Sequence, residues 1–237
     1  MAMELKNVVP FGRSLDEYVK MFNLTQSDLQ KSILSVGDGP ASFNAEGTKL
    51  GYKIKSLDPL YELTADRIRS RFDEVVDNII EQIKNSPDDW VWTYHGSPDG
   101  LRKNRERVID IFCEDYEIGK GENRYEIGEL PKLKYCDREY DLGLCSHFLF
   151  LYSNQFDDNF HFDSICEMLR VCQEVRIFPL LTLSLMPSPH LQPVLARLEA
   201  RGYSCTIQKV SYQLQRGGNE MLKIIKTEIL HHSQLGG

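Results

Sequence analysis

The chain has 237 residues, enough to bury one sizeable core, so one domain with an insertion is the expected organisation. Its net charge of -7 and isoelectric point near 5.4 argue against a general nucleic-acid-binding protein, which would usually present a basic face. The sequence contains no run of about 18 apolar residues, which excludes a membrane-spanning helix.

The six cysteines include no C-x-x-C pair and lie mostly within apolar segments, which is typical of reduced core thiols. Residues 1–13 lack the long apolar core of a secretory signal. Both observations predict a cytoplasmic protein. The histidines share no ligand spacing, so no metal site is predicted.

The first elements are expected to be helices. Ser14 and Glu17 have the spacing of a capping box, and a second short helix is expected to start at Thr25. Strands should follow over residues 32–36 and 53–57. Residues 1–31 are therefore interpreted as a helical cap on the domain.

A glycine turn joins the first of these strands to the helix that precedes the second strand. Gly37, Asp38, Gly39 and Pro40 directly follow the first strand, and Asp58 closes the second. Glycine lets a ligand approach the backbone closely, and an acid at the end of the next strand can accept hydrogen bonds from both ribose hydroxyls. The pattern predicts a nucleoside-binding site, against the alternative of a surface turn beside a solvated aspartate.

Residues 60–124 form a long excursion after the second strand. Apolar residues recur at intervals of three and four from Ile68 to Ile83, which predicts an amphipathic helix, and a second, more charged helix is expected over residues 99–116. Between them, Trp90, Trp92, Tyr94 and His95 either line an acceptor pocket or pack this insertion onto the sheet.

The remaining chain alternates short strands and helices. Strands are expected at residues 125–127, 142–150, 174–183, 204–210 and 220–226, and helices at 163–172 and 190–201. The pattern predicts an α/β fold with a Rossmann-like, mostly parallel seven-stranded sheet and helices on both faces. The short link before the last strand predicts that this strand is antiparallel.

Four segments resemble those of class I S-adenosylmethionine-dependent methyltransferases, most closely bacterial members with no assigned substrate: residues 34–39, 57–59, 128–135 and 140–142. The resemblance implies that the donor S-adenosylmethionine is bound by the glycine turn, by the ribose-binding acid and by an acid that contacts the adenine amino group. The donor-binding residues would be Arg13, Gly37, Asp38, Gly39, Pro40, Asp58, Pro59, Glu129, Leu130 and Ser146.

The chain departs from the family pattern at the glycine turn. Ser35 stands where the family often has an acid, Ala41 stands where it has a glycine, and Asp38 lies inside the turn. An acid there either attracts the ammonium of the donor or signals altered donor binding. No Asn-Pro-Pro-Tyr motif follows the fourth strand, which disfavours methylation of nucleic-acid amino groups and favours N- or O-methylation of a small molecule.

Ligands of open α/β sheets bind beyond the carboxyl ends of the strands. His147 follows the fourth strand and is the candidate base, because imidazole titrates near neutral pH; the alternative is a packing role. Arg216 is expected either to bind an acidic group or to be solvated. The predicted acceptor-binding residues are Tyr152, Tyr212, Arg216 and Asn219.

Two other functions are compatible with these observations. A nicotinamide-dependent oxidoreductase is disfavoured, because Ser42 stands where its glycine fingerprint ends in glycine or alanine. A non-catalytic protein that binds S-adenosylmethionine remains open because of Ser35 and Asp38. The sequence does not indicate an oligomeric state.

Overall fold

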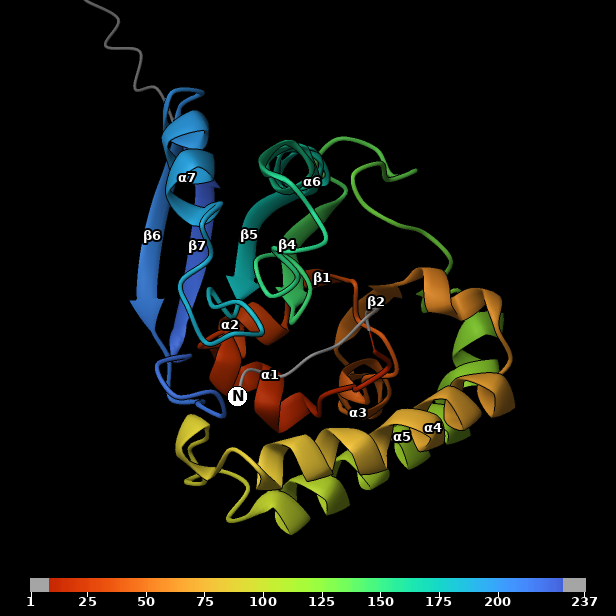
Figure 1. The fold of residues 1–237 in the computed structure, drawn as a ribbon. Helices are drawn as coiled ribbons and strands as arrows, with labels where there is room; N and C mark the ends of the chain where they lie inside the picture. The colour runs from red at the N-terminus through yellow and green to blue at the C-terminus, as the bar shows by residue number, and fades with distance from the viewer. Residues whose placement is uncertain (1–8, 228–237) are drawn as a thin grey trace, which may run out of the picture.

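The computed structural model describes residues 9–227 and arranges them as a sheet with helices on both faces (Figure 1). The strands are β1 (Ser32–Val36), β2 (Lys53–Leu57), β3 (Tyr125–Glu126), β4 (Tyr140–Ser146), β5 (Cys172–Phe178), β6 (Tyr203–Lys209) and β7 (Glu220–Lys226). The α-helices are α1 (Leu15–Met21), α2 (Gln26–Leu29), α3 (Phe43–Lys49), α4 (Ala65–Lys84), α5 (Pro98–Gly121), α6 (Asp158–Val171) and α7 (Leu191–Glu199), and two 3-10 turns are η1 (Pro59–Glu62) and η2 (Pro87–Asp89).

Within residues 9–227, the sheet has seven strands in the order β3-β2-β1-β4-β5-β7-β6. β1 pairs in parallel with β2 and β4, and β4 pairs in parallel with β5. β7 runs antiparallel between β5 and β6. The predicted fold class, with its reversed C-terminal strand, is confirmed.

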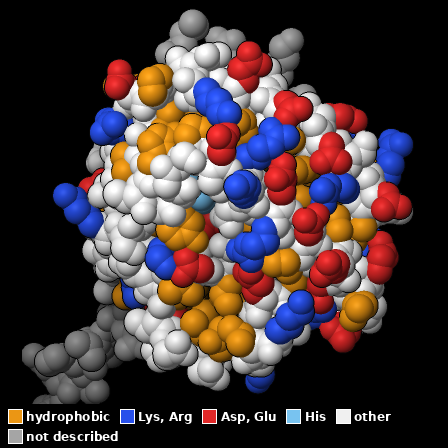
Figure 2. Space-filling model, turned by 90° about the horizontal axis from the view of Figure 1, so that it is seen from below, with side chains coloured by type: hydrophobic (Ala, Val, Ile, Leu, Met, Phe, Trp, Pro, Cys, Tyr) orange, Lys and Arg blue, Asp and Glu red, His pale blue; other side chains and the backbone are white. Residues whose placement is uncertain are grey.

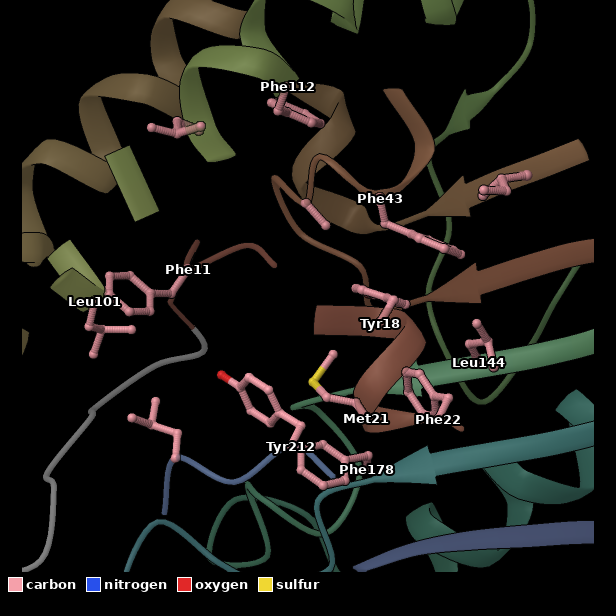
Figure 3. Close-up of a cluster of buried hydrophobic side chains, with 14 of the residues drawn as sticks. Phe11, Tyr18, Met21, Phe22, Phe43, Leu101, Phe112, Leu144, Phe178 and Tyr212 are labelled. Atoms are coloured by element: carbon pink, nitrogen blue, oxygen red, sulfur yellow. The ribbon is translucent and has the colours of Figure 1, made fainter. Parts of the chain in front are cut away.

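Alternate residues of the strands point into two separate cores. Ile33 of β1 and Leu144 of β4 pack with the aromatic residues of α1, α3 and the α4–α5 pair. Leu34 and Cys145 point the other way, toward α6 and α7. Figure 3 shows the first core, where Tyr18 and Met21 of α1 lie between the sheet and the excursion. The period of two along each strand thus builds both faces of the sheet.

The excursion forms an antiparallel pair of long helices. In Figure 1 α4 and α5 run side by side below the carboxyl ends of the strands. Ion pairs join their outer faces, including Arg69 with Asp110 and Lys84 with Asp99. Figure 2 shows acidic and basic side chains interspersed over this side of the molecule. The charged residues that the sequence places on these helices therefore form a solvated surface.

Two central strands are shorter than the apolar runs predict. β4 ends at Ser146 because His147 and Phe150 adopt left-handed backbone angles, with φ of 55° and 66°. β5 ends at Phe178 because Pro179 follows and has no N–H to pair. The apolar residues beyond both ends form buried loops instead, and these loops carry part of the site.

Candidate functional site

A cleft of about 520 Å³ opens at the carboxyl ends of β1, β2 and β4. Sites for small molecules usually have volumes of roughly 300–1,000 Å³, so the cleft is large enough for a nucleoside-sized ligand. It brings together most of the predicted donor-binding residues, which line it with His147: Arg13, Gly37, Asp38, Gly39, Asp58, Pro59, Glu129, Leu130 and Ser146.

The glycine turn forms one wall of this cleft. Gly37 donates its N–H to the carbonyl of Leu57 at 2.9 Å, which joins the ends of β1 and β2. Gly37 and Gly39 have φ of 67° and 55°, the left-handed region that glycine adopts without strain. A Cβ atom added at Gly39 would meet no atom within 4 Å. The backbone of Gly39 is therefore open to the cleft, as a close approach by a ligand requires.

Asp58 lies across the cleft from the cap and is held by the backbone. Its two carboxylate oxygens accept hydrogen bonds from Gly39 N and Leu60 N, each at 2.8 Å. Each oxygen has two acceptor positions, so one on each oxygen remains for a ligand hydroxyl. Enclosure by the protein raises the pKa of Asp58 to about 6, although these two hydrogen bonds act in the opposite direction.

Asp38 is buried beneath the turn and bonded to three hydroxyl groups. It accepts from Ser35 Oγ at 2.6 Å, from Ser56 Oγ at 2.5 Å and from the Tyr18 hydroxyl. Burial raises its pKa, and the serine and tyrosine hydrogen bonds partly oppose this shift. The carboxylate of Asp38 therefore lies beside Ser35. In the family, the acid often stands at the position of Ser35 itself, three residues before Asp38.

The segment before α1 covers the turn. Gly12 lies so close to Pro40 that an added Cβ would be 2.1 Å from the Pro40 oxygen, and Ser42 N donates to Arg13 O at 3.1 Å. Pro40 is buried under this contact. Arg13 donates from Nη1 to the carbonyl of Phe11, whereas its buried Nε has no hydrogen-bond partner among the described residues. We call residues 9–13 the strap.

His147 lies where β4 meets the cleft. Its ring atom Nδ1 is 2.8 Å from Ser146 Oγ, and its backbone N–H donates to the carbonyl of Phe178 at 2.6 Å. Burial away from water is the main cause that holds the pKa of His147 well below its usual value, and the positive charges of Arg13 and Arg105 add to this shift. The ring is therefore neutral at neutral pH. Its left-handed backbone is uncommon for a residue other than glycine, and such conformations cluster at functional sites.

A second, narrower cavity adjoins the cleft and shares Val9, Phe11, Arg13 and His147 with it. Its volume is about 70 Å³. We call it the apolar pocket. Its other lining residues come from α4, α5 and their connection, the end of β5, the loops after β4 and β5, and the β6–β7 loop: Ile79, Ile83, Trp90, Leu101, Leu151, Tyr152, Phe178, Leu183, Tyr212, Leu214, Gln215 and Gly218. Figure 3 shows Phe11, Leu101 and the Tyr212 hydroxyl converging on this region.

A buried ion pair beside the apolar pocket was not anticipated from the sequence. Arg105 of α5 binds both carboxylate oxygens of Glu17 in α1, at 2.7 and 2.8 Å. The Tyr212 hydroxyl donates to Glu17 at 2.9 Å, and His95 Nε2 lies 3.5 Å from the same oxygen. Burial alone would raise the pKa of Glu17, but Arg105 and His95 outweigh it and hold the pKa well below its usual range.

One signal in the sequence does point to this pair. Arg105 lies four residues after Leu101 and three before Val108, on the buried stripe of α5. A charge on a buried stripe needs a partner, because an unpaired buried charge is strongly destabilising. Glu17 gave no such signal, because its capping-box role with Ser14 already accounts for it, and the structure shows that bond as well.

Two predicted acceptor residues line the apolar pocket and two do not. Tyr152 and Tyr212 are part of its wall. Arg216 is exposed and donates to the carbonyls of Asp88 and Trp90, which ties the β6–β7 loop to the α4–α5 connection. Asn219 accepts from Val210 N at 2.9 Å at the start of β7 and lies outside the lining of both cavities.

Within residues 9–227, no group of three or more histidine, cysteine, aspartate or glutamate side chains is placed to hold a metal ion. Over the same residues, none of the helices has the length and apolar character needed to cross a membrane.

Comparison with known proteins finds a relative that matches almost the whole chain. No family model matches the chain. Over 223 residues it is 36% identical to the uncharacterized protein MJ0045 of Methanocaldococcus jannaschii, a match that covers 94% of this chain and 98% of that protein. The chain belongs to the family of that protein.

Solved structures show similarity of fold only. Magnesium protoporphyrin IX methyltransferase of Synechocystis PCC 6803 with bound S-adenosylmethionine matches 90% of this chain and 78% of its own, with a TM-score of 0.47 and 11% identity. Mitomycin 7-O-methyltransferase matches 90% of this chain and 54% of its own, with a TM-score of 0.48 and 13% identity. The strand order with β7 reversed is that of the class I methyltransferase fold, as the sequence resemblance predicted.

Proposed function

We propose that the protein is an S-adenosylmethionine-dependent methyltransferase that acts on a small-molecule acceptor at nitrogen or oxygen. The observation that carries the proposal is the junction of two cavities. The cleft is lined by the glycine turn and four carboxylates, it adjoins an apolar pocket, and His147 and Arg13 line both.

The residues of the cleft suit the donor group by group. Asp58 has acceptor positions for two ribose hydroxyls, and Arg13 has an unpartnered N–H for a carboxylate. Glu129 lines the same cleft, and we assign it to the adenine amino group. Asp38 is buried and already accepts from three hydroxyl donors, so we assign it to shaping the turn and to the electrostatics of the cleft. When bound, the donor would supply an electrophilic methyl group on its sulfonium.

The chain contributes alignment, a dry environment and a proton acceptor. Methyl transfer from a sulfonium is an in-line displacement, which depends chiefly on orientation and on exclusion of water. Apolar side chains surround the junction from α4, α5 and two loops. His147 is neutral at neutral pH and can accept the proton of an acceptor group without first losing one itself.

Ligand binding distinguishes this function from its alternatives. We expect S-adenosylmethionine and S-adenosylhomocysteine to bind the purified chain in calorimetry and NAD to give no heat of binding. Incubation with a metabolite extract should then release S-adenosylhomocysteine. Donor binding without release would indicate a non-catalytic binding protein, and binding of NAD alone would indicate an oxidoreductase.

A further inference from the structure

The chemistry of the acceptor follows from how polar groups are distributed in the apolar pocket. Its interior is formed by aliphatic and aromatic side chains of α4, α5 and the β6–β7 loop. Arg13 and His147 lie at the mouth, which is shared with the cleft. A ligand that fills the pocket therefore presents an apolar body inward and a polar end toward the methyl donor.

We propose that the acceptor has a slim hydrophobic body ending in an acidic oxygen, a phenol or a carboxylic acid, and that this oxygen faces Arg13 and His147 and receives the methyl group. This inference rests on the proposed function and gives it a substrate class.

The charges near the mouth favour an anion over a cation. Glu17 is the carboxylate beside the apolar pocket, and Arg105 engages both of its oxygens. Arg13 has no carboxylate within ion-pair distance among the described residues, and its Nε is unpartnered. A guanidinium has five N–H donors, so Arg13 can serve a carboxylate in the cleft and an oxygen in the pocket. Among the described residues, no carboxylate belongs to the lining of the apolar pocket, so an ammonium group inside it would find no counter-ion.

Ser146 positions His147 for proton acceptance. Its Oγ lies 2.8 Å from Nδ1 of His147, so a hydrogen bond between these two atoms orients the ring. In the tautomer that carries its proton on Nδ1, Nε2 has the lone pair that a proton acceptor requires. For a phenol, the oxygen forms the new C–O bond, the electrons of the broken C–S bond stay on sulfur, and the phenolic proton passes to Nε2. A carboxylate is already ionised and gives up no proton.

The apolar pocket is much smaller than the cleft, which favours a small acceptor body such as one ring or a short branched chain. Its volume of about 70 Å³ is far below that of the cleft. Leu183 is half-buried in the wall and comes from the loop after β5, so an enlarged side chain there would fill the pocket without approaching the cleft.

Three single-ring probes test the proposal on the full chain: phenylacetate, p-cresol and phenethylamine. Calorimetry or saturation-transfer NMR without donor should show saturable binding of phenylacetate and p-cresol at least about tenfold tighter than that of phenethylamine. Arg13→Met should bring the phenylacetate-to-phenethylamine ratio close to one. Leu183→Trp should abolish binding of both oxygen probes, whereas Met186→Trp, at a position 63% exposed, is the matched control. Leu214→Phe replaces Leu183→Trp if that variant does not fold.

Turnover supplies the second readout. With S-adenosylmethionine, phenylacetate and p-cresol should give methyl ester and methyl ether, and His147→Ala should reduce the p-cresol rate far more than the phenylacetate rate. Equal affinity for the three probes, methylation of phenethylamine, or binding that survives both filling variants would overturn the proposal. If the wild-type chain did not bind S-adenosylmethionine, the proposed function would be refuted instead. The two failures can be distinguished because binding of the probes is measured without donor.

Discussion

The cleft and the apolar pocket share a wall but are built from the sequence in different ways. The cleft is lined mainly by short segments that each follow one strand: the glycine turn after β1, Asp58 and Pro59 after β2, and Ser146 and His147 after β4. The apolar pocket is assembled from single side chains of helices and loops up to 209 positions apart, from Val9 to Gly218.

This difference explains why one cavity can be recognised from sequence and the other cannot. A nucleoside demands particular groups at fixed positions, so the residues that bind it form a local pattern. An apolar acceptor demands only shape, so its contacts look like ordinary core residues until the chain is folded. Variants that affect one cavity and spare the other test whether this division is real.

The largest expected effect is at His147, which belongs to both cavities. His147→Ala should lower turnover of a phenol-type acceptor by about 10²–10⁴-fold and leave donor affinity nearly unchanged. Because its pKa is held well below the usual value, the wild-type rate should show no acid limb from this group near pH 6. His147→Asn, which tolerates the left-handed backbone, is the folding control. A parallel loss of donor affinity would assign His147 to the cleft alone.

The ion pair beside the apolar pocket should affect stability more than donor binding. Arg105→Ala leaves Glu17 buried without its counter-ion and should cost about 3–5 kcal/mol of unfolding free energy in urea titrations. The double variant Glu17→Gln with Arg105→Met should recover much of that loss, because no charge then remains buried. If the single variant were as stable as the parent chain, the pair would have no structural role.

Asp58 tests the cleft alone. Asp58→Ala should weaken S-adenosylmethionine binding by about 1.5–3 kcal/mol in calorimetry, the range for a hydrogen bond to a charged group. Binding of phenylacetate to the apolar pocket should not change, since Asp58 is not part of its lining. An unchanged donor affinity would remove the ribose assignment.

The same carboxylate predicts how donor binding responds to pH. The pKa of Asp58 is raised to about 6, so the group gains a proton as the pH falls through that value and loses an acceptor for the ribose. Donor affinity should therefore fall about tenfold between pH 7 and pH 5. Asp58→Asn, which has no titrating group, should lack this component. A flat profile in the parent chain would indicate that Asp58 does not contact the donor.

Much of the fold could be predicted because its elements have strong periodic signals. β1, β2 and β7 begin and end where the apolar patterns place them, and the capping boxes at Ser14 and Thr25 start α1 and α2. The ends of β4 and β5 could not be predicted from apolarity, because residues 147–152 and 179–183 are buried or half-buried in loops rather than in strands. A left-handed histidine and a proline decide those ends, and only the proline is visible in the sequence.

The candidate site was predictable to the extent that it follows strand ends. His147 and Asp58 were chosen because parallel strands deliver their carboxyl ends to one edge, and both lie in the cleft. Arg216 was chosen by the same rule, but its loop folds back onto the α4–α5 connection and uses the guanidinium there. The partnership of Glu17 with Arg105 joins residues 88 positions apart, and no local pattern encodes it.

The bidentate contact between Glu17 and Arg105 has a consequence for the ancestry of the chain. One half of the pair belongs to the cap and the other to the excursion after β2, so a chain that lost either segment alone would leave the other charge without its partner. In a related protein that lacks the helix pair, an acid at the position of Glu17 would keep only its capping-box role with Ser14. Transplanting the excursion onto another member of the fold would require moving α1 with it.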